Sequence, residues 1–144
     1  MAGSLARMGF AFAALALALA AWPFAAPAGE PRRVFVVHSY NPEYIWTHNV
    51  NQGLVEALKS HDVILDYHYM DAKRRPSPEW LRQSARDAFE RIRSFGPDVV
   101  VTVDDAAQEY LVVPYLKGSH RPQVIFCGVN ADPAKDGFPA SNVS

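Results

Sequence analysis

The sequence predicts an α/β protein built on a doubly wound parallel sheet. Short runs rich in β-branched residues alternate along the chain with stretches of helical periodicity. Two of the runs, residues 34–37 and 99–103, are apolar throughout except for one threonine, as is typical of parallel strands covered on both faces. The segments between the runs are long enough for right-handed helical crossovers. The predicted order is four strands joined by three helices, which is a flavodoxin-like or Rossmann-like arrangement.

The first two strands and their connection come from residues 34–70. Residues 34–37 form the first predicted strand, and Thr47 is the predicted N-cap of the following helix. Residues 63–70 alternate apolar side chains with Asp66 and His68, which favours a strand near the sheet edge. The apolar residues that share one face of the helix are Val50, Leu54, Ala57 and Leu58.

The second helix has clear start and stop signals. Ser77 is a predicted N-cap followed by Pro78 at the first helical position, and Gly96-Pro97 ends the helix. Its apolar stripe consists of Leu81, Ala85, Ala88, Phe89 and Ile92.

The third strand, residues 99–103, leads into a short helix. Asp105 occupies the predicted N-cap, and Gln108 three residues later would complete a capping box. The helix is expected to run from Ala106 to near Pro114.

The fourth strand is predicted at residues 124–127, followed by a turn at 128–130. Cys127 is the sole cysteine, so it cannot form an internal disulfide, and its apolar neighbours predict that it is buried. Residues 132–144 lack hydrophobic periodicity. We interpret residues 29–131 as one lobe and 132–144 as the start of a crossover to a second lobe absent from this sequence. A frayed terminus is the alternative.

The N-terminus predicts export. Arg7 precedes an uncharged apolar run at residues 8–22, and Ala26-Pro27-Ala28 fits a signal-peptidase site. Residues 1–28 are therefore read as a signal peptide, and the mature protein as periplasmic. An uncleaved membrane anchor is less favoured, because a span of about 20 residues would have to include Pro23 and Pro27.

Composition excludes several classes of partner. Fourteen Lys and Arg balance 15 Asp and Glu without a basic block, which argues against nucleic acid or anionic membranes as partners. The short clusters Arg32-Arg33 and Lys73-Arg74-Arg75 are interpreted as solvated surface. No Cys/His cluster has metal-ligand spacing and no glycine-rich phosphate loop follows a strand, so no cofactor or metal is predicted.

Ligands of open parallel sheets bind beyond the carboxyl ends of the strands. Residues 38–42, 104–106 and 128–130 reach that edge in the predicted fold, and Tyr44 and Trp46 follow closely after the first of these segments. Their hydroxyls, carboxylates, amide and aromatic rings suit a small polar or zwitterionic molecule. The aromatic residues could equally be a ligand platform or the packing of a long loop.

Catalysis is disfavoured by the same residues. Ser39 with His38 or His48 is a poor nucleophile–base pair, because adjacent side chains on an extended chain point apart and Gly-x-Ser-x-Gly is absent. Asp104 and Asp105 are better explained as one ligand-facing carboxylate and one N-cap than as a metal site or acid–base pair. The sequence therefore predicts a non-catalytic binding protein.

Four motifs together resemble one family. They are Val36-Val37-His38-Ser39-Tyr40-Asn41-Pro42 with Trp46-Thr47, residues 101–107, residues 122–130 and residues 137–144. In order and spacing they are similar to ABC-transporter substrate-binding proteins with the type I periplasmic-binding fold. The resemblance implies two lobes that close on a small molecule and then dock on a membrane permease. With the aromatic Trp46 added, the candidate ligand-binding residues are Ser39, Tyr40, Trp46, Asp104, Asp105, Ala106, Gly128, Val129 and Asn130.

Two other functions stay open at this point. The same domain also occurs as the sensor portion of bacterial signalling receptors, fused to a kinase or cyclase module. An extracytoplasmic enzyme is the third possibility, and its catalytic residues would have to come from outside this sequence. Family members are about twice the length of the mature chain, since two lobes of roughly 100–150 residues each are needed.

Overall fold

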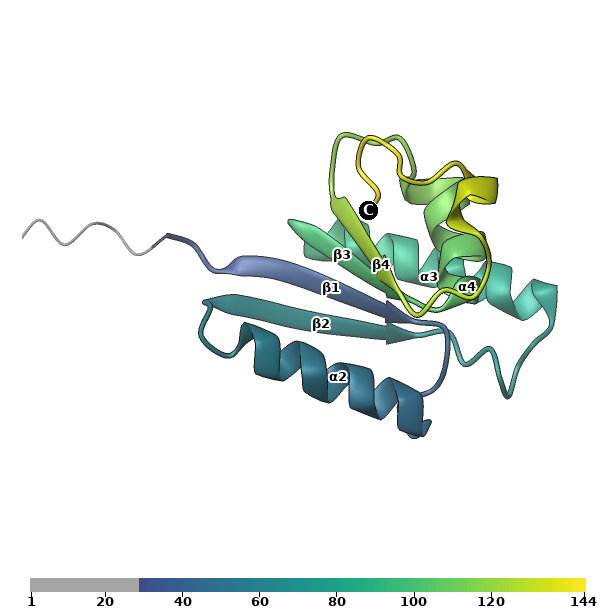
Figure 1. Ribbon diagram of the computed structural model, residues 1–144, viewed down its shortest axis with the longest axis horizontal. Coiled ribbons are helices and arrows are strands. Elements are labelled where there is room, and N and C mark those ends of the chain that lie inside the picture. Colours follow the sequence, from purple (N-terminus) through teal and green to yellow (C-terminus); the bar gives the residue numbers. More distant parts are fainter. Residues whose placement is uncertain (1–28) are drawn as a thin grey trace, which may run out of the picture.

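The computed structural model describes residues 29–144, so the predicted signal peptide at residues 1–28 lies outside the described residues (Figure 1). Four parallel strands form one sheet in the order β2-β1-β3-β4. The strands are β1 (Arg32–His38), β2 (Val63–Tyr69), β3 (Val99–Val103) and β4 (Gln123–Cys127). This arrangement confirms the predicted α/β class, the parallel sheet and the edge position of the second strand.

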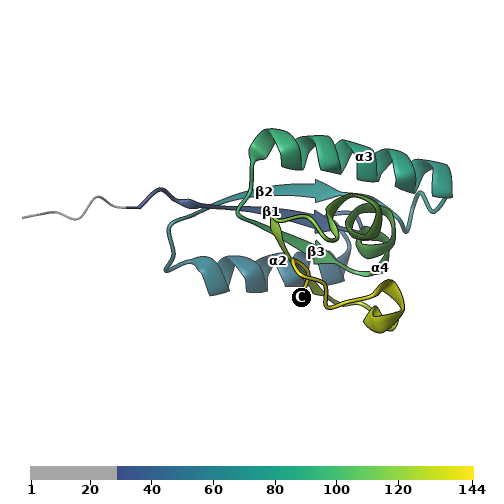
Figure 2. The same cartoon turned by 90° about the horizontal axis from the view of Figure 1, so that it is seen from above.

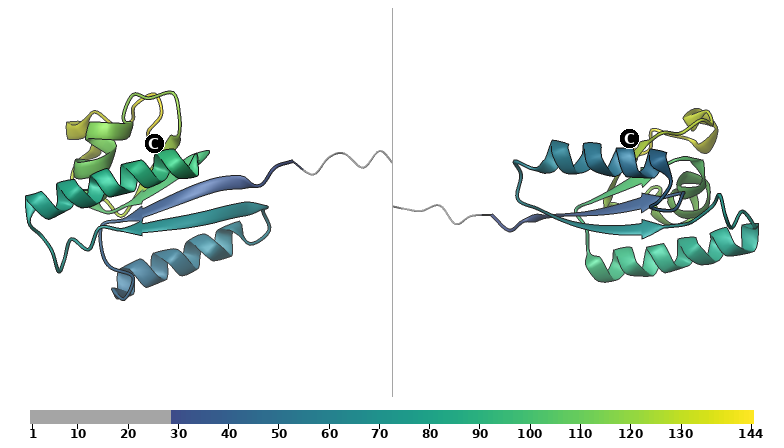
Figure 3. Two further views of the ribbon diagram at one scale, coloured as in Figure 1. Left: turned by 180° about the vertical axis from the view of Figure 1, so that it is seen from behind. Right: turned by 90° about the horizontal axis from the view of Figure 1, so that it is seen from below.

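The sheet is covered by helices on both faces. Helix α2 (Ile45–Leu58) lies on one face, whereas α3 (Pro78–Phe95), α4 (Asp105–Ala107) and the π-helical segment η1 (Gln108–Leu116) lie on the other (Figures 2 and 3). The chain leaves β1 in one direction to reach β2 and then returns past β1 to build β3 and β4. The strand order thus reverses between β1 and β3, where loops at the carboxyl ends can diverge and leave a crevice.

Helix α3 is the best-predicted element. The Ser77 hydroxyl accepts a hydrogen bond from the Trp80 amide, Pro78 is the first helical residue, and Gly96 ends the helix in a left-handed conformation. The buried residues of its predicted stripe are Leu81, Ala85, Ala88 and Ile92, while Phe89 is half-buried. They pack with η1 and with the face of the sheet opposite α2 to form the larger of two hydrophobic cores.

Helix α2 begins three residues earlier than predicted. Tyr44, in an extended conformation, precedes it, so Thr47 is not the N-cap but a buried residue inside the helix. Thr47 is the single buried residue of α2. Val50 and Leu54 are only half-buried against the upper face of the sheet, and Ala57 of the predicted face is exposed. This helix is therefore attached less firmly by apolar packing than α3.

The connection after β3 differs from its prediction. Asp104, not Asp105, precedes α4, and the Gln108 side chain donates to Thr102 Oγ1 at 2.6 Å instead of completing a capping box. The helix continues past Pro114 as the π-helical η1. Pro114 has no amide hydrogen to donate, and in a regular α-helix its ring would clash with the carbonyl four residues earlier; this segment has π-helical hydrogen bonding instead.

Cys127 was expected to be buried, and that prediction is wrong: its side chain is exposed. Cys127 and Ile125 pair in register with Val103 and Val101 and so share the sheet face on which α2 lies. Helix α2 covers β1 and β2 but not β4, and Ile125 is accordingly 48% exposed.

Residues 132–144 pack against β4. After the short 3-10 helix η2 (Pro133–Asp136), the chain returns to the strand, where the Val124 amide donates to Asn142 O at 2.7 Å and the Ser144 amide donates to Val124 O at 2.9 Å. Phe138 and Val143 are buried. The frayed-terminus alternative is therefore wrong, and a continuation into a second lobe stays a prediction. Within residues 29–144, no helix is long and apolar enough to cross a membrane.

Candidate functional site

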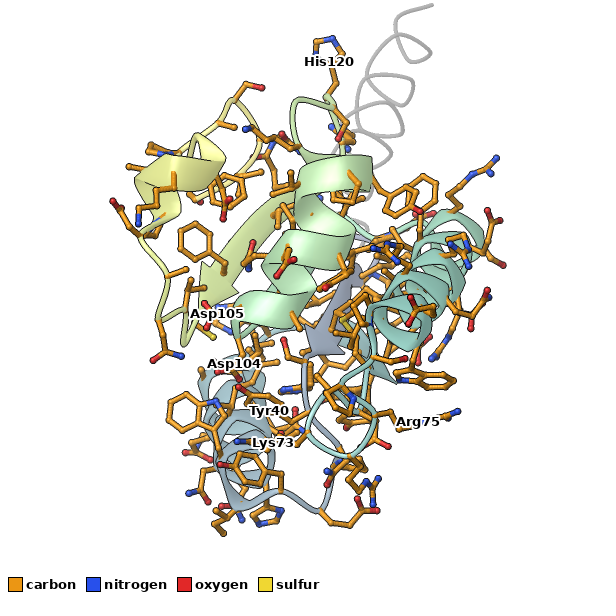
Figure 4. The ribbon with its side chains drawn as sticks, turned by 90° about the vertical axis from the view of Figure 1, so that its right-hand side faces the viewer. Tyr40, Lys73, Arg75, Asp104, Asp105 and His120 are labelled. Carbon is orange, nitrogen blue, oxygen red and sulfur yellow. The ribbon has the colours of Figure 1, made fainter. Side chains whose placement is uncertain are left out.

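A pocket of about 420 Å³ lies at the carboxyl ends of β1, β3 and β4, at the point where the strand order reverses. It opens to solvent, and aromatic, charged and backbone groups contribute to its surface. Figure 4 shows Tyr40, Lys73 and Asp104 close together at this end of the molecule. The lining residues are Tyr40, Tyr44, Trp46, Lys73, Asp104, Gly128, Val129 and Asn130.

Most of the residues predicted from the sequence meet in this pocket. The structure brings together Tyr40, Trp46, Asp104, Gly128, Val129 and Asn130. It leaves Ser39, Asp105 and Ala106 outside the lining. Tyr40, Tyr44 and Trp46 all line the pocket, and the Tyr40 and Tyr44 rings also pack on one another, so both roles considered for the aromatic residues stay open.

Asp104 is held in a strained backbone conformation. Its φ of 68° and ψ of 171° belong to a region that is populated almost only by glycine, at a cost of about 1–3 kcal/mol. The residue is 5% exposed, and its Oδ2 accepts a hydrogen bond from Trp46 Nε1 at 2.9 Å. Burial raises the pKa of Asp104, although the bond from Trp46 and the charge of Lys73 act in the opposite direction. The other carboxylate oxygen, Oδ1, has no hydrogen-bond donor among residues 29–144.

Gly128 lets the Trp46 indole approach the turn after β4. Its φ is 69°, and a Cβ at this position would lie 3.1 Å from Trp46 Cζ2 and 3.6 Å from Asp104 Oδ1. Only glycine satisfies both the left-handed backbone and the contact without adjustment. The indole therefore lies close to both the turn at Gly128 and the buried carboxylate of Asp104.

Ser39 and Asp105 support the pocket from outside its lining. The Ser39 hydroxyl donates to Val103 O at 2.7 Å and accepts from the Ala107 amide at 2.9 Å, which ties the end of β1 to the end of β3 and to α4. Asp105 is partly buried, which opposes its ionisation. The hydrogen bonds from the Ala131 and Asn130 amides and the Asn130 side chain outweigh that effect and lower its pKa. Asp105 thereby fixes the turn after β4.

Lys73 was missed by the sequence analysis, which assigned the cluster at 73–75 to solvated surface. Its ammonium lies 4.7 Å from the ring centroids of both Tyr40 and Tyr44, and those rings pack edge to face at 5.2 Å. The loop after β2 starts at the same carboxyl edge as the other three, directly beside β1. Counting all four strand ends in place of three would have identified it.

Searches against protein-family models, curated proteins and solved structures found no match to this chain. Among residues 29–144, no group of three or more His, Cys, Asp or Glu side chains could hold a metal ion.

Proposed function

We propose that this chain is the first lobe of an extracytoplasmic solute-binding protein of the type I periplasmic kind. It captures a small polar, amino-acid-like molecule without altering it and delivers it to the permease of an ABC importer. The observation that carries the proposal is the pocket at the reversal of strand order. There, the buried carboxylate of Asp104, whose backbone is strained, lies close to three aromatic rings.

The chemistry of the pocket supports binding of a polar molecule. Asp104 Oδ1 is available to accept a hydrogen bond from an amine or hydroxyl group, while Trp46, Tyr40 and Tyr44 offer ring surfaces for an apolar part. The Asp105 and Ser39 hydrogen bonds fix the surrounding loops before any ligand arrives. Such preorganisation reduces the entropy that binding has to offset.

The position of Ser39 argues against nucleophilic catalysis. A nucleophilic serine donates its proton to a base, but this hydroxyl donates to the Val103 carbonyl, which cannot accept the proton permanently. Ser39 is also buried beneath the pocket, at 1% exposure. Capture without turnover fits these contacts better than acyl transfer does.

The pocket is open on the side away from the sheet, where Trp46 is 43% exposed. Closure of a second lobe over this side would remove the ligand and the indole from water, as hinge-type binding proteins do. The proposal therefore predicts that the gene continues past Ser144 into a second α/β lobe. A membrane span and a cytoplasmic module downstream would favour the sensor function instead, and an immediate stop codon would rule out both two-lobe functions.

A thermal-shift panel of amino acids, sugars and small anions tests the binding function on the complete gene product. A compound that binds the folded protein raises its melting midpoint by mass action. Asp104→Ala is expected to weaken that binding while the protein still folds. Gln108→Ala is a suitable control, since its side chain is buried away from the pocket and bonds Thr102. If no compound raises the midpoint, or if Asp104→Ala binds as tightly as wild type, this assignment of the site is wrong.

A further inference from the structure

We infer that Lys73 is the anion-binding residue of the pocket, so that the ligand carries an acidic group, a carboxylate or a phosphate. This inference rests on the proposed function and adds the charge of the ligand. It is based on the three consecutive basic residues at 73–75, of which only Lys73 lines the pocket.

Arg74 and Arg75 have partners elsewhere, whereas Lys73 faces the pocket. Arg74 pairs with Asp71 at 2.7 Å and with Glu43 at 3.5 Å. The Arg75 guanidinium stacks 3.2 Å from the centroid of the Trp80 ring, and Figure 4 shows it directed away from Lys73 and Tyr40. Within residues 29–144, no carboxylate lies within 4.0 Å of the Lys73 ammonium.

The backbone holds the loop that presents Lys73. The Met70 and Ala72 amides donate to the carbonyls of His38 and Ser39, both at 2.8 Å, which extends the pairing of β2 with β1 into the loop. Asp71 then adopts a φ of 59°, and its carbonyl accepts from the Arg74 and Arg75 amides. Asp71 and Asp104 are the two non-glycine residues with positive φ among residues 29–144, and both lie in loops that build this pocket.

The tyrosine rings orient the ammonium without neutralising it. Tyr40 and Tyr44 hold the charge of Lys73 by cation–π attraction, which supplies no formal negative charge. An ammonium has three donors, so hydrogens remain for a ligand oxygen. Asp104, the one carboxylate in the lining, already accepts from Trp46 through Oδ2. A ligand with an acidic end at Lys73 and a donor group at Asp104 Oδ1 would complement both charges.

The test uses four simple aromatic probes on the complete gene product: benzoate, phenyl phosphate, the neutral isostere benzamide, and benzylamine. Dissociation constants are measured by NMR titration for wild type, Lys73→Gln, Lys73→Arg and Lys135→Gln. Lys135 is exposed on η2 and does not line the pocket, so it controls for a general loss of positive charge.

We expect wild type to bind at least one acidic probe more tightly than benzamide and benzylamine. Lys73→Gln should weaken that binding about five- to tenfold, as expected for loss of one charge-assisted hydrogen bond. Lys73→Arg keeps the positive charge but not the compact ammonium over the two rings, so it should lose less binding than Lys73→Gln. Lys135→Gln should change binding less than about twofold, because a distant exposed charge is screened, and benzamide binding should not respond to any variant. The tighter of the two acidic probes identifies carboxylate or phosphate as the preferred group.

Tighter binding of benzamide or benzylamine, or acidic-probe binding that is unchanged in Lys73→Gln, overturns the inference and leaves the binding function intact. Equal losses in Lys73→Gln and Lys73→Arg also overturn it, because the side chain would then act through its shape in the loop and not through its charge. If neither the probes nor any compound of the thermal-shift panel binds, the inference and the proposed function fail together.

Discussion

Replacement of Gly128 by alanine tests two features of this turn: its left-handed backbone and the close contact with the Trp46 ring. An added Cβ puts a side chain on a left-handed backbone with φ of 69°, which costs about 1–2 kcal/mol. It also places a carbon 3.1 Å from Trp46 Cζ2, closer than the roughly 3.5–4.0 Å of an ordinary carbon–carbon contact. Because Trp46 is exposed on one side, the indole is expected to move outward and lose its bond to Asp104.

The second effect adds to the first. Loss of the Trp46 donor leaves the buried Asp104 carboxylate with one hydrogen bond fewer, a penalty of about 1–3 kcal/mol. The total for Gly128→Ala is therefore about 2–5 kcal/mol. Gly96→Ala is the matched control, since Gly96 has a similar φ of 62° but open space where the Cβ would lie, so only the backbone cost of about 1–2 kcal/mol applies.

Urea unfolding of the complete protein measures both losses, and the Trp46 indole N–H resonance in NMR spectra reports on its hydrogen bond. We expect Gly128→Ala to be less stable than Gly96→Ala, to shift that resonance and to weaken any ligand binding. Equal destabilisation of the two variants, with an unmoved indole resonance, would falsify the view that the turn is shaped to receive Trp46.

Two further predictions concern the supports of the sheet. Burial lowers the pKa of both His38 and His68, so protons bind the unfolded chain more readily than the folded one below the ordinary histidine pKa of about 6.5. The urea concentration at the unfolding midpoint should therefore decrease as the pH is lowered from about 7 to about 5.5. This decrease should be smaller when His68 is replaced by Gln. A midpoint that does not depend on pH would contradict the prediction. Ser39→Ala leaves the buried Ala107 amide without its acceptor and should destabilise the protein by about 1–3 kcal/mol, against almost no change for the exposed Ser141→Ala; equal urea midpoints for the two variants would show that the Ser39 bridge contributes nothing.

Periodicity and capping signals predicted the fold well. The continuous apolar run at residues 99–103 and the Ser77-Pro78 start of α3 depend on local chemistry, and both have the structure that this chemistry favours. The start of α2 was misplaced because Thr47 has the right side chain for a cap, yet is buried inside the helix. Burial of Cys127 was misjudged because exposure of β4 depends on which strands α2 covers, a tertiary property with no local signal.

The location of the pocket was predictable, but the contacts of each residue around it were not. Strand ends mark the edge where ligands bind, so Tyr40, Asp104 and Gly128 could be gathered from the sequence alone. The positive φ of Asp104 could not, since aspartate after a strand is far more often an N-cap than a strained residue. The scaffold role of Ser39 depends on its distance to Ala107, a residue 68 positions away along the chain.

The return of residues 142–144 to β4 also changes what the outer edge of the sheet offers to other molecules. An outer strand displays a row of amides and carbonyls that can pair with the same strand of another molecule and start aggregation. Here the Val124 amide, the Val124 carbonyl and the Phe126 amide are already bonded to Asn142 and Ser144. Figure 3 shows this last segment beside β4. The segment thus occupies backbone groups of β4 that could otherwise pair with a strand of another molecule.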